Sequence, residues 1–66
     1  MRIIVNGTQT DCLENISLDK WLMDAGYDKK RIAVEVNEKI IKKAEYANYI
    51  LAPNDKLEVV SFVGGG

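Results

Sequence analysis

The amino-acid sequence predicts an α+β domain, in which one mixed sheet of about four to five strands carries one main helix on one of its faces. Three features lead to this expectation: an Asn-Gly turn between two strand-like runs at the start, one amphipathic helical segment, and a long strand-like segment near the end. The chain has 66 residues. That length provides for a single domain, so the elements must share one small core.

The opening residues predict a β-hairpin. Residues 2–5 are a largely β-branched run, residues 8–13 are compatible with a strand, and Asn6-Gly7 separates them. Asparagine and glycine both tolerate the positive φ that a two-residue type I′ turn requires. We therefore expect antiparallel strands at 2–5 and 8–13.

The segment after the hairpin predicts the main helix. Its apolar residues recur at i, i+3, i+4 and i+7, which places them on one face of a helix. These residues are Leu18, Trp21, Leu22 and Ala25. Ser17 is suited to cap the first turn, Asp19 suits the positive end of the helix dipole, and Gly26 is a typical left-handed stop. We expect the apolar face to pack on the sheet, with Trp21 as its largest contact.

The middle of the chain predicts two further strands and a loop. Residues 32–36 alternate so that Ile32, Val34 and Val36 share one face. Ile40-Ile41 follows across an Asn-Glu turn and can form a short strand. Residues 42–49 are mostly polar, and we expect a loop with one helical turn there.

A final strand is predicted at residues 56–63, after the turn signal Pro53-Asn54-Asp55. Leu57 and Val59 are expected against the helix. Val60 and Phe62 would then lie on the open face of the sheet, joined by Ile4 if the first strand is adjacent. We interpret Ile4, Val60 and Phe62 as a surface on which a partner protein docks.

Composition restricts the function classes that the chain can serve. The formal net charge is −1, there is no histidine, and Cys12 is the single cysteine. Histidine-dependent triads, histidine metal sites and cysteine-based zinc sites therefore need residues that the chain lacks. We expect no catalytic residue, no bound metal or cofactor, no nucleic-acid or membrane partner, and a cytoplasmic protein that is monomeric when free. Cys12 is expected to be a small buried hydrophobe on a strand.

The chemistry is expected at the end of the sequence, where Gly64-Gly65-Gly66 directly follows the last strand. Glycine has the largest backbone freedom, so we expect residues 64–66 to form a flexible tail on a β-rich domain of residues 1–63. Without Cβ atoms such a tail can enter a narrow channel in a partner. The Gly66 carboxylate is a poor electrophile until adenylation gives it a good leaving group, which a sulfur nucleophile can then displace. Inert frayed glycines are the alternative interpretation.

Three stretches and the chain length together carry a family resemblance. They are Arg2-Ile3-Ile4-Val5-Asn6-Gly7, Val34-Glu35-Val36-Asn37 followed by Ile40-Ile41, and Val59-Val60-Ser61-Phe62-Val63-Gly64-Gly65-Gly66. In these the chain resembles the ubiquitin-like sulfur carrier proteins of thiamine biosynthesis, the ThiS family, over essentially its whole length. Pro53-Asn54-Asp55 departs from the Asp-Gly-Asp-like turn that relatives often have, which affects the turn type.

The resemblance implies a β-grasp fold and a sulfur-transfer cycle. An ATP-dependent adenylyltransferase (ThiF-like) would bind the ATP and activate Gly66, and sulfur from a donor such as a cysteine desulfurase would give a thiocarboxylate. Thiazole synthase (ThiG-like) would then take the sulfur into the thiazole ring. Gly65 and Gly66 match the Gly-Gly end of the family, and Gly64 matches its frequent extra tail residue. Three alternatives remain open: a sulfur carrier for molybdopterin synthesis, a protein modifier that forms isopeptide bonds through Gly66, and an inert binding module.

Overall fold

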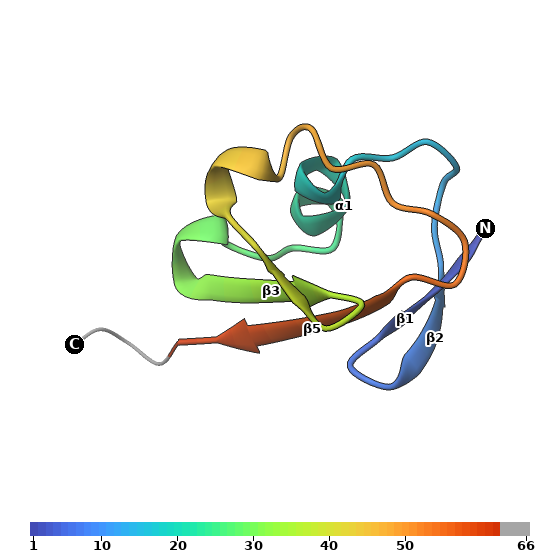
Figure 1. Cartoon of the computed structure of the whole chain (residues 1–66), viewed down its shortest axis with the longest axis horizontal. Helices are drawn as coiled ribbons and strands as arrows, with labels where there is room; N and C mark the ends of the chain where they lie inside the picture. Colours follow the sequence, from blue (N-terminus) through green and yellow to red (C-terminus); the bar gives the residue numbers. More distant parts are fainter. Residues whose placement is uncertain (63–66) are drawn as a thin grey trace.

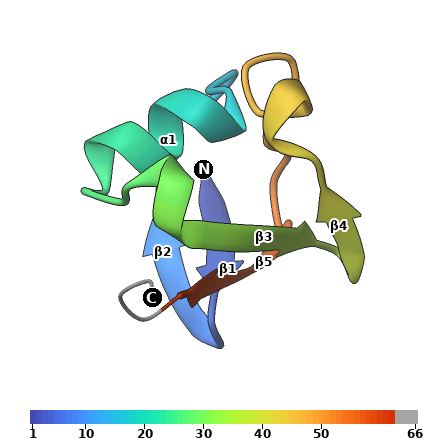
Figure 2. The same cartoon turned by 90° about the vertical axis from the view of Figure 1, so that its left-hand side faces the viewer.

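The structure, a computed structural model, describes residues 1–62 and confirms the predicted α+β fold. Its elements in chain order are β1 (Arg2–Val5), β2 (Thr8–Asp11), α1 (Leu18–Asp24), the 3₁₀ turn η1 (Lys29–Arg31), β3 (Ile32–Val36), β4 (Lys39–Ile41), the 3₁₀ turn η2 (Lys43–Glu45) and β5 (Lys56–Ser61). The five strands form one sheet in the order β2-β1-β5-β3-β4. Helix α1 lies across one face of this sheet (Figures 1 and 2).

The first and last strands lie side by side in the middle of the sheet. β1 pairs with β5 in parallel, with Ile4 opposite Lys56 and Val5 opposite Leu57, whereas the other three strand pairs are antiparallel. The Ile4 N–H donates to the Asp55 carbonyl over 2.9 Å, and the Asn6 N–H donates to the Leu57 carbonyl over the same distance. This central parallel pair on a mixed sheet with one helix is the expected β-grasp arrangement.

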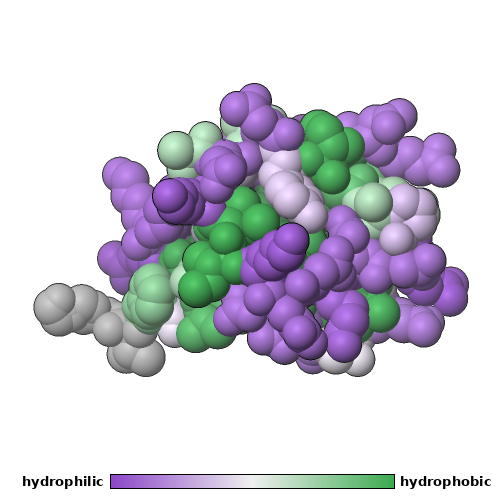
Figure 3. All heavy atoms as spheres, viewed as in Figure 1, coloured by the Kyte–Doolittle hydropathy of each residue, from purple (hydrophilic) through white to green (hydrophobic). Residues whose placement is uncertain are grey.

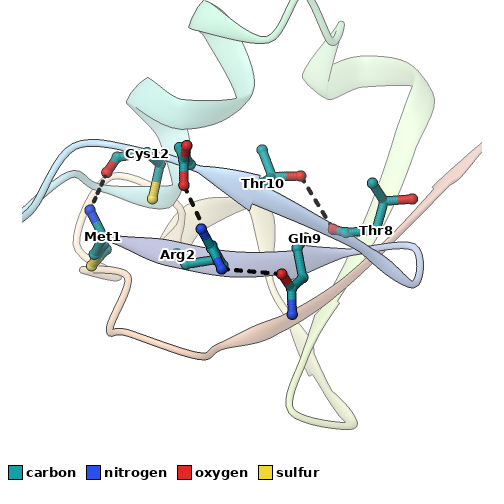
Figure 4. Close-up of polar contacts among 7 residues, drawn as sticks. Met1, Arg2, Thr8, Gln9, Thr10 and Cys12 are labelled. Carbon is teal, nitrogen blue, oxygen red and sulfur yellow. Dashed lines mark hydrogen bonds and ion pairs between the residues drawn. The ribbon is translucent and has the colours of Figure 1, made fainter.

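The opening hairpin forms as predicted but its second strand is shorter. Asn6 and Gly7 have φ values of 49° and 83°, as a type I′ turn requires. β2 ends at Asp11, whereas the sequence pattern extended it to residue 13. Cys12 already lies opposite Met1, since its N–H donates to the Met1 carbonyl and its carbonyl accepts from the N-terminal ammonium (Figure 4). The β1–β2 ladder thus ends at the pair of Arg2 with Asp11, followed by this Met1–Cys12 contact.

Helix α1 begins where the sequence predicts and ends at Asp24, one residue before the end of the predicted apolar face. The Ser17 hydroxyl accepts from the Lys20 N–H over 3.1 Å, which caps the first turn, and Gly26 follows the helix with a φ of 88°. Trp21 and its apolar neighbours are buried against the sheet, but Ala25 is the exposed C-cap residue rather than a core residue. The apolar periodicity predicted that Ala25 lies in the core, because periodicity carries no information about where the helix ends.

The core lies between α1 and the sheet, and it includes two residues that no periodic pattern marks. Its buried apolar residues are Ile3, Val5, Ile16, Leu18, Trp21, Leu22, Ile32, Val34, Val36, Tyr46, Leu51, Leu57 and Val59. Ile16 and Leu51 belong to irregular segments that meet at the start of the helix, where the Leu51 N–H donates to the Ile16 carbonyl over 2.9 Å. The long connection from η2 to β5 thus closes the open end of the core (Figure 1). No helix among the described residues is long and apolar enough to cross a membrane.

The connection into β5 is held by a buried carboxylate. Asp55 is 7% exposed, and its two carboxylate oxygens accept from the Asn37 side-chain amide over 3.0 Å and from the Ala52 N–H over 2.8 Å. The Asn37 side chain in turn accepts from the Lys56 N–H over 3.0 Å. One side chain therefore fixes the turn before β5 to the turn that joins β3 and β4.

Replacing Asp55 by alanine should destabilise the fold, because Ala52 and Asn37 would each keep a donor without its acceptor. We expect Asp55→Ala to lower the free energy of unfolding by about 1–3 kcal/mol. Urea denaturation followed by circular dichroism measures this. Asp11→Ala is the matched control: that carboxylate is exposed and paired only with Arg2, and the expected change is under about 0.5 kcal/mol. Equal losses in the two variants would contradict the role given to Asp55.

Candidate functional site

The candidate site lies on the face of the sheet that turns away from the helix. Alternation along β5 buries Leu57 and Val59 against α1, whereas Glu58, Val60 and Phe62 are exposed on or beside the opposite, open face. The last strand therefore supplies both the core and the surface. It runs towards the end of the molecule farthest from the N-terminus (Figure 1).

Two of the three proposed docking residues, Val60 and Phe62, are large apolar side chains that are each 55% exposed. Ile40 of β4, which the sequence analysis did not single out for docking, is 76% exposed on the same face. We call Ile40, Val60 and Phe62 the open-face patch; Ile40 stands level with Glu58 and two strands away from β5, so Glu35 and Glu58 lie between it and the two β5-side residues. Exposed apolar groups of this size on a small domain are typical of surfaces that bind other proteins.

Ile4 differs from the other two docking residues. It is half-buried, and it lies on the open face opposite Lys56 at the start of β5. Val60 is four residues further along the strand, which is about 13 Å away at the rise of a β-strand. Ile4 therefore does not adjoin Phe62, contrary to the sequence expectation that it joins them. A docking role for Ile4, Val60 and Phe62 stays a prediction.

Figure 3 shows that apolar side chains gather on the surface over β3 and β4, within a mostly hydrophilic surface. Tyr46 belongs to the buried core, and Tyr49 and Tyr27 pack against that core. The ring centroids of Tyr27 and Trp21 are 6.0 Å apart. The tyrosines thus complete a small core.

Asn6 holds the outgoing half of β5, a role that the sequence did not reveal. Its side-chain oxygen accepts from the Val59 N–H over 2.9 Å, and its side-chain amide donates to the Val59 carbonyl over 3.2 Å. β1 has already ended at this level of the sheet, so the asparagine side chain takes the place that a strand residue would fill. On its other side β5 stays paired, since the Phe62 N–H donates to the Arg31 carbonyl over 2.7 Å. The strand is therefore held on both edges up to Val59.

Cys12 is half-buried and lies just after β2, not fully buried within a strand as expected. Burial raises the pKa of its thiol; the N-terminal ammonium lowers the pKa, while Asp11 and Asp55 raise it further, and the net direction is upward. A raised pKa keeps the thiol protonated at neutral pH, and the thiolate is the reactive form. This environment does not activate Cys12 as a nucleophile.

A surface hollow of about 310 Å³ lies between the end of β2 and the helix. Its lining residues are Thr10, Asp11, Cys12, Leu13, Ile16, Trp21, Asp24 and Ala25. The charged groups of this lining are both carboxylates, which repel phosphate groups. Among residues 1–62 no group of three or more potential metal ligands comes together.

The predicted reactive end, Gly64-Gly65-Gly66, and the boundary between the domain 1–63 and the tail 64–66 lie outside the described residues. The nearest described part of the chain is the exposed Phe62, which follows the end of β5 at Ser61. Val63, which the sequence analysis included in the last strand, also lies outside the described residues.

Comparison with known proteins identifies the family. The model of the ThiS family matches residues 3–66. The chain belongs to the ThiS family. This is the family of sulfur carrier proteins that the sequence resembles, and membership covers the glycine end as well as the sheet.

Individual relatives agree with this assignment. The chain is 35% identical over its full length to a thiazole synthase of Paramagnetospirillum magneticum and 33% identical to one of Magnetococcus marinus. It spans only 20% of the length of each of these two proteins. The chain is also similar in fold to the crystal structure of the thiamine biosynthesis protein ThiS of Geobacter metallireducens, with a TM-score of 0.85, 22% identity and full coverage of both chains.

The bonds between Asn6 and Val59 predict a local effect on the outgoing strand. Asn6→Gly keeps the positive φ of the turn but removes both side-chain bonds. We expect hydrogen exchange at the Val59 amide to become about fivefold faster, because a bond worth about 1 kcal/mol is lost. NMR-detected exchange measures this, with the Val34 amide in β3 as internal reference. Unchanged protection of Val59 would show that the bonds do not hold the strand.

Proposed function

We propose that the chain is a sulfur carrier that acts in thiamine biosynthesis through the carboxylate of Gly66. The observation that carries the proposal is membership of the ThiS family over a match that includes the glycine end. The open-face patch beside the end of β5 supports it, because a glycine tail offers no side chains by which partners could recognise it. The face of the domain must supply that recognition.

The proposed cycle divides the chemistry between the chain and its partners. A ThiF-like adenylyltransferase joins AMP from ATP to the Gly66 carboxylate and releases pyrophosphate. A sulfur nucleophile attacks the acyl carbon and displaces AMP: sulfide-level sulfur gives the thiocarboxylate directly. When the donor is the persulfide of a cysteine desulfurase, the attack gives an acyl disulfide, and a thiol reductant then cleaves its S–S bond and releases the thiocarboxylate. The chain is then a cosubstrate of its partners and not itself the enzyme. Placing ATP on the partner accords with the hollow beside α1, whose charged lining residues are both carboxylates.

A ThiG-like thiazole synthase is the proposed acceptor of the sulfur. Two proteins named thiazole synthase each contain a segment alike to this whole chain, as a fifth of their length. A segment of this kind and the rest of a thiazole synthase therefore occur in one polypeptide. This favours the thiazole pathway over molybdopterin synthesis as the destination of the sulfur.

Intact mass spectrometry tests the proposed chemistry. After incubation with the adenylyltransferase, ATP and a sulfur source, we expect a mass gain of about 16 Da, since one oxygen is replaced by sulfur. The control is a variant that lacks Gly65 and Gly66, which should gain nothing. Attachment to lysines of other proteins would instead show a modifier, and no change with any activating enzyme would show an inert module.

The open-face patch predicts a binding defect without a folding defect. Phe62→Ala should weaken complex formation with the adenylyltransferase about tenfold, because an apolar anchor at a binding surface is worth about 1–2 kcal/mol. Titration calorimetry measures the affinity, and thermal unfolding checks the fold. Met23→Ala is the matched control, because Met23 is 59% exposed but lies on α1, on the other side of the sheet. Equal affinities for wild type and Phe62→Ala would remove Phe62 from the docking surface.

A further inference from the structure

Two carboxylates face each other across the centre of the sheet. Glu35 of β3 lies directly opposite Glu58 of β5 in the antiparallel register. Their chain neighbours Val34, Val36, Leu57 and Val59 are buried against the helix, so both carboxylates belong to the open face. Directly opposed residues have Cβ atoms about 4.5–5.5 Å apart, and like charges in such a pair oppose folding. Sequences break such a local rule chiefly at functional sites.

Within residues 1–62 neither carboxylate takes part in an ion pair. Lys56 shares their face two residues before Glu58, yet it makes no ion pair with either of them. The described ion pairs of this chain join other residues, on β1 and β2, on α1, and around η1. The Glu35–Glu58 pair therefore offers its negative charge outward.

The open-face patch flanks this charge with apolar groups on two sides. Ile40 lies directly opposite Glu35 on the far side of β3, so Ile40, Glu35 and Glu58 form one row across three strands. Val60 follows two residues after Glu58 on the same face, and Phe62 two residues after that. A protein that covers the patch would exclude water from the pair, and the attraction of the two carboxylates for a cation would strengthen.

We propose that the Glu35–Glu58 pair receives an arginine side chain of thiazole synthase, flanked by apolar residues that cover Ile40, Val60 and Phe62. The inference rests on the proposed function for the identity of the partner. A guanidinium suits the site better than an ammonium, because it is planar, weakly hydrated and able to bridge two carboxylates with parallel hydrogen bonds. The acidic, apolar-flanked face of this chain therefore calls for a basic, apolar-rimmed surface on the partner.

Neutralising the pair tests the proposal. Glu35→Gln and Glu58→Gln should each weaken binding to the thiazole synthase of the same organism by about five- to tenfold, and the affinity difference from wild type should shrink as salt is raised from 50 to about 500 mM. Titration calorimetry with the full chain measures this. Glu14→Gln, in the exposed loop after β2, removes the same charge elsewhere and should change affinity by less than about twofold.

Urea unfolding and the mass measurement separate a binding defect from a folding defect and from failure of the proposed function. Urea unfolding should show both variants at least as stable as wild type, because a repulsive cross-strand pair is relieved, so weaker binding cannot be ascribed to unfolding. Wild-type affinity in Glu35→Gln and Glu58→Gln, or an effect equal to that of Glu14→Gln, would overturn the inference. So would a defect confined to the adenylyltransferase. Failure of the proposed function is distinguishable, because wild type itself would then gain no sulfur in the mass measurement.

Discussion

The parallel pairing of β1 with β5 is the contact on which the rest of the structure depends. It joins residues more than fifty positions apart, as in the pair Val5 and Leu57, and it is made at only two register positions. Closing so long a loop costs entropy, which the burial of both strands against α1 helps to offset. Once it forms, β5 has a neighbour on each side, because β3 pairs along its other edge. The last strand of the chain is thereby the central strand of the sheet.

In this position β5 contributes to both the core and the open face, and the alternation of its side chains separates the two sets of residues. Leu57 and Val59 fill the core, whereas Glu58 and Val60 face outward. A substitution on the outward set changes the surface with little effect on packing, while one on the inward set creates a cavity. Asn6 adds to this separation, because its side chain fixes Val59 where β1 no longer reaches. The outward residues are therefore presented by a strand held along both edges.

Much of this fold could be predicted because local signals and the fold agree. The Asn6-Gly7 turn, the Ser17 cap and the alternation of residues 32–36 each specify their element through neighbouring residues alone. What the sequence could not show depends on contacts between distant segments. The burial of Leu51 follows from its meeting with Ile16, and the second role of Asn6 requires the register of a strand 53 residues away. Such registers have no periodic signature.

The candidate site was predictable to a similar extent and for the same reason. Alternation along β5 placed Val60 and Phe62 outward correctly, since it needs only the parity of one strand. The expectation that Ile4 adjoins these residues was wrong. The position of Ile4 depends on the register between β1 and β5, and the alternation within one strand does not reveal that register. That Glu35 lies directly opposite Glu58 could not be predicted either, because it depends on the register between β3 and β5. Each glutamate alone looks like an ordinary solvated charge, and only the β3–β5 register makes them a pair.

The division between tail and face has a consequence for how a carrier of this kind selects its partners. Glycine residues carry no side chains, so they cannot distinguish one enzyme from another, and the discrimination falls to the sheet. A carrier must also leave each partner after a single step, which a very large apolar interface would hinder. Charge on a modest apolar patch suits both needs, because it speeds association and fixes register without enlarging the apolar contact. The proposed role of the acidic pair Glu35–Glu58 within the open-face patch is consistent with a surface that is used briefly and repeatedly.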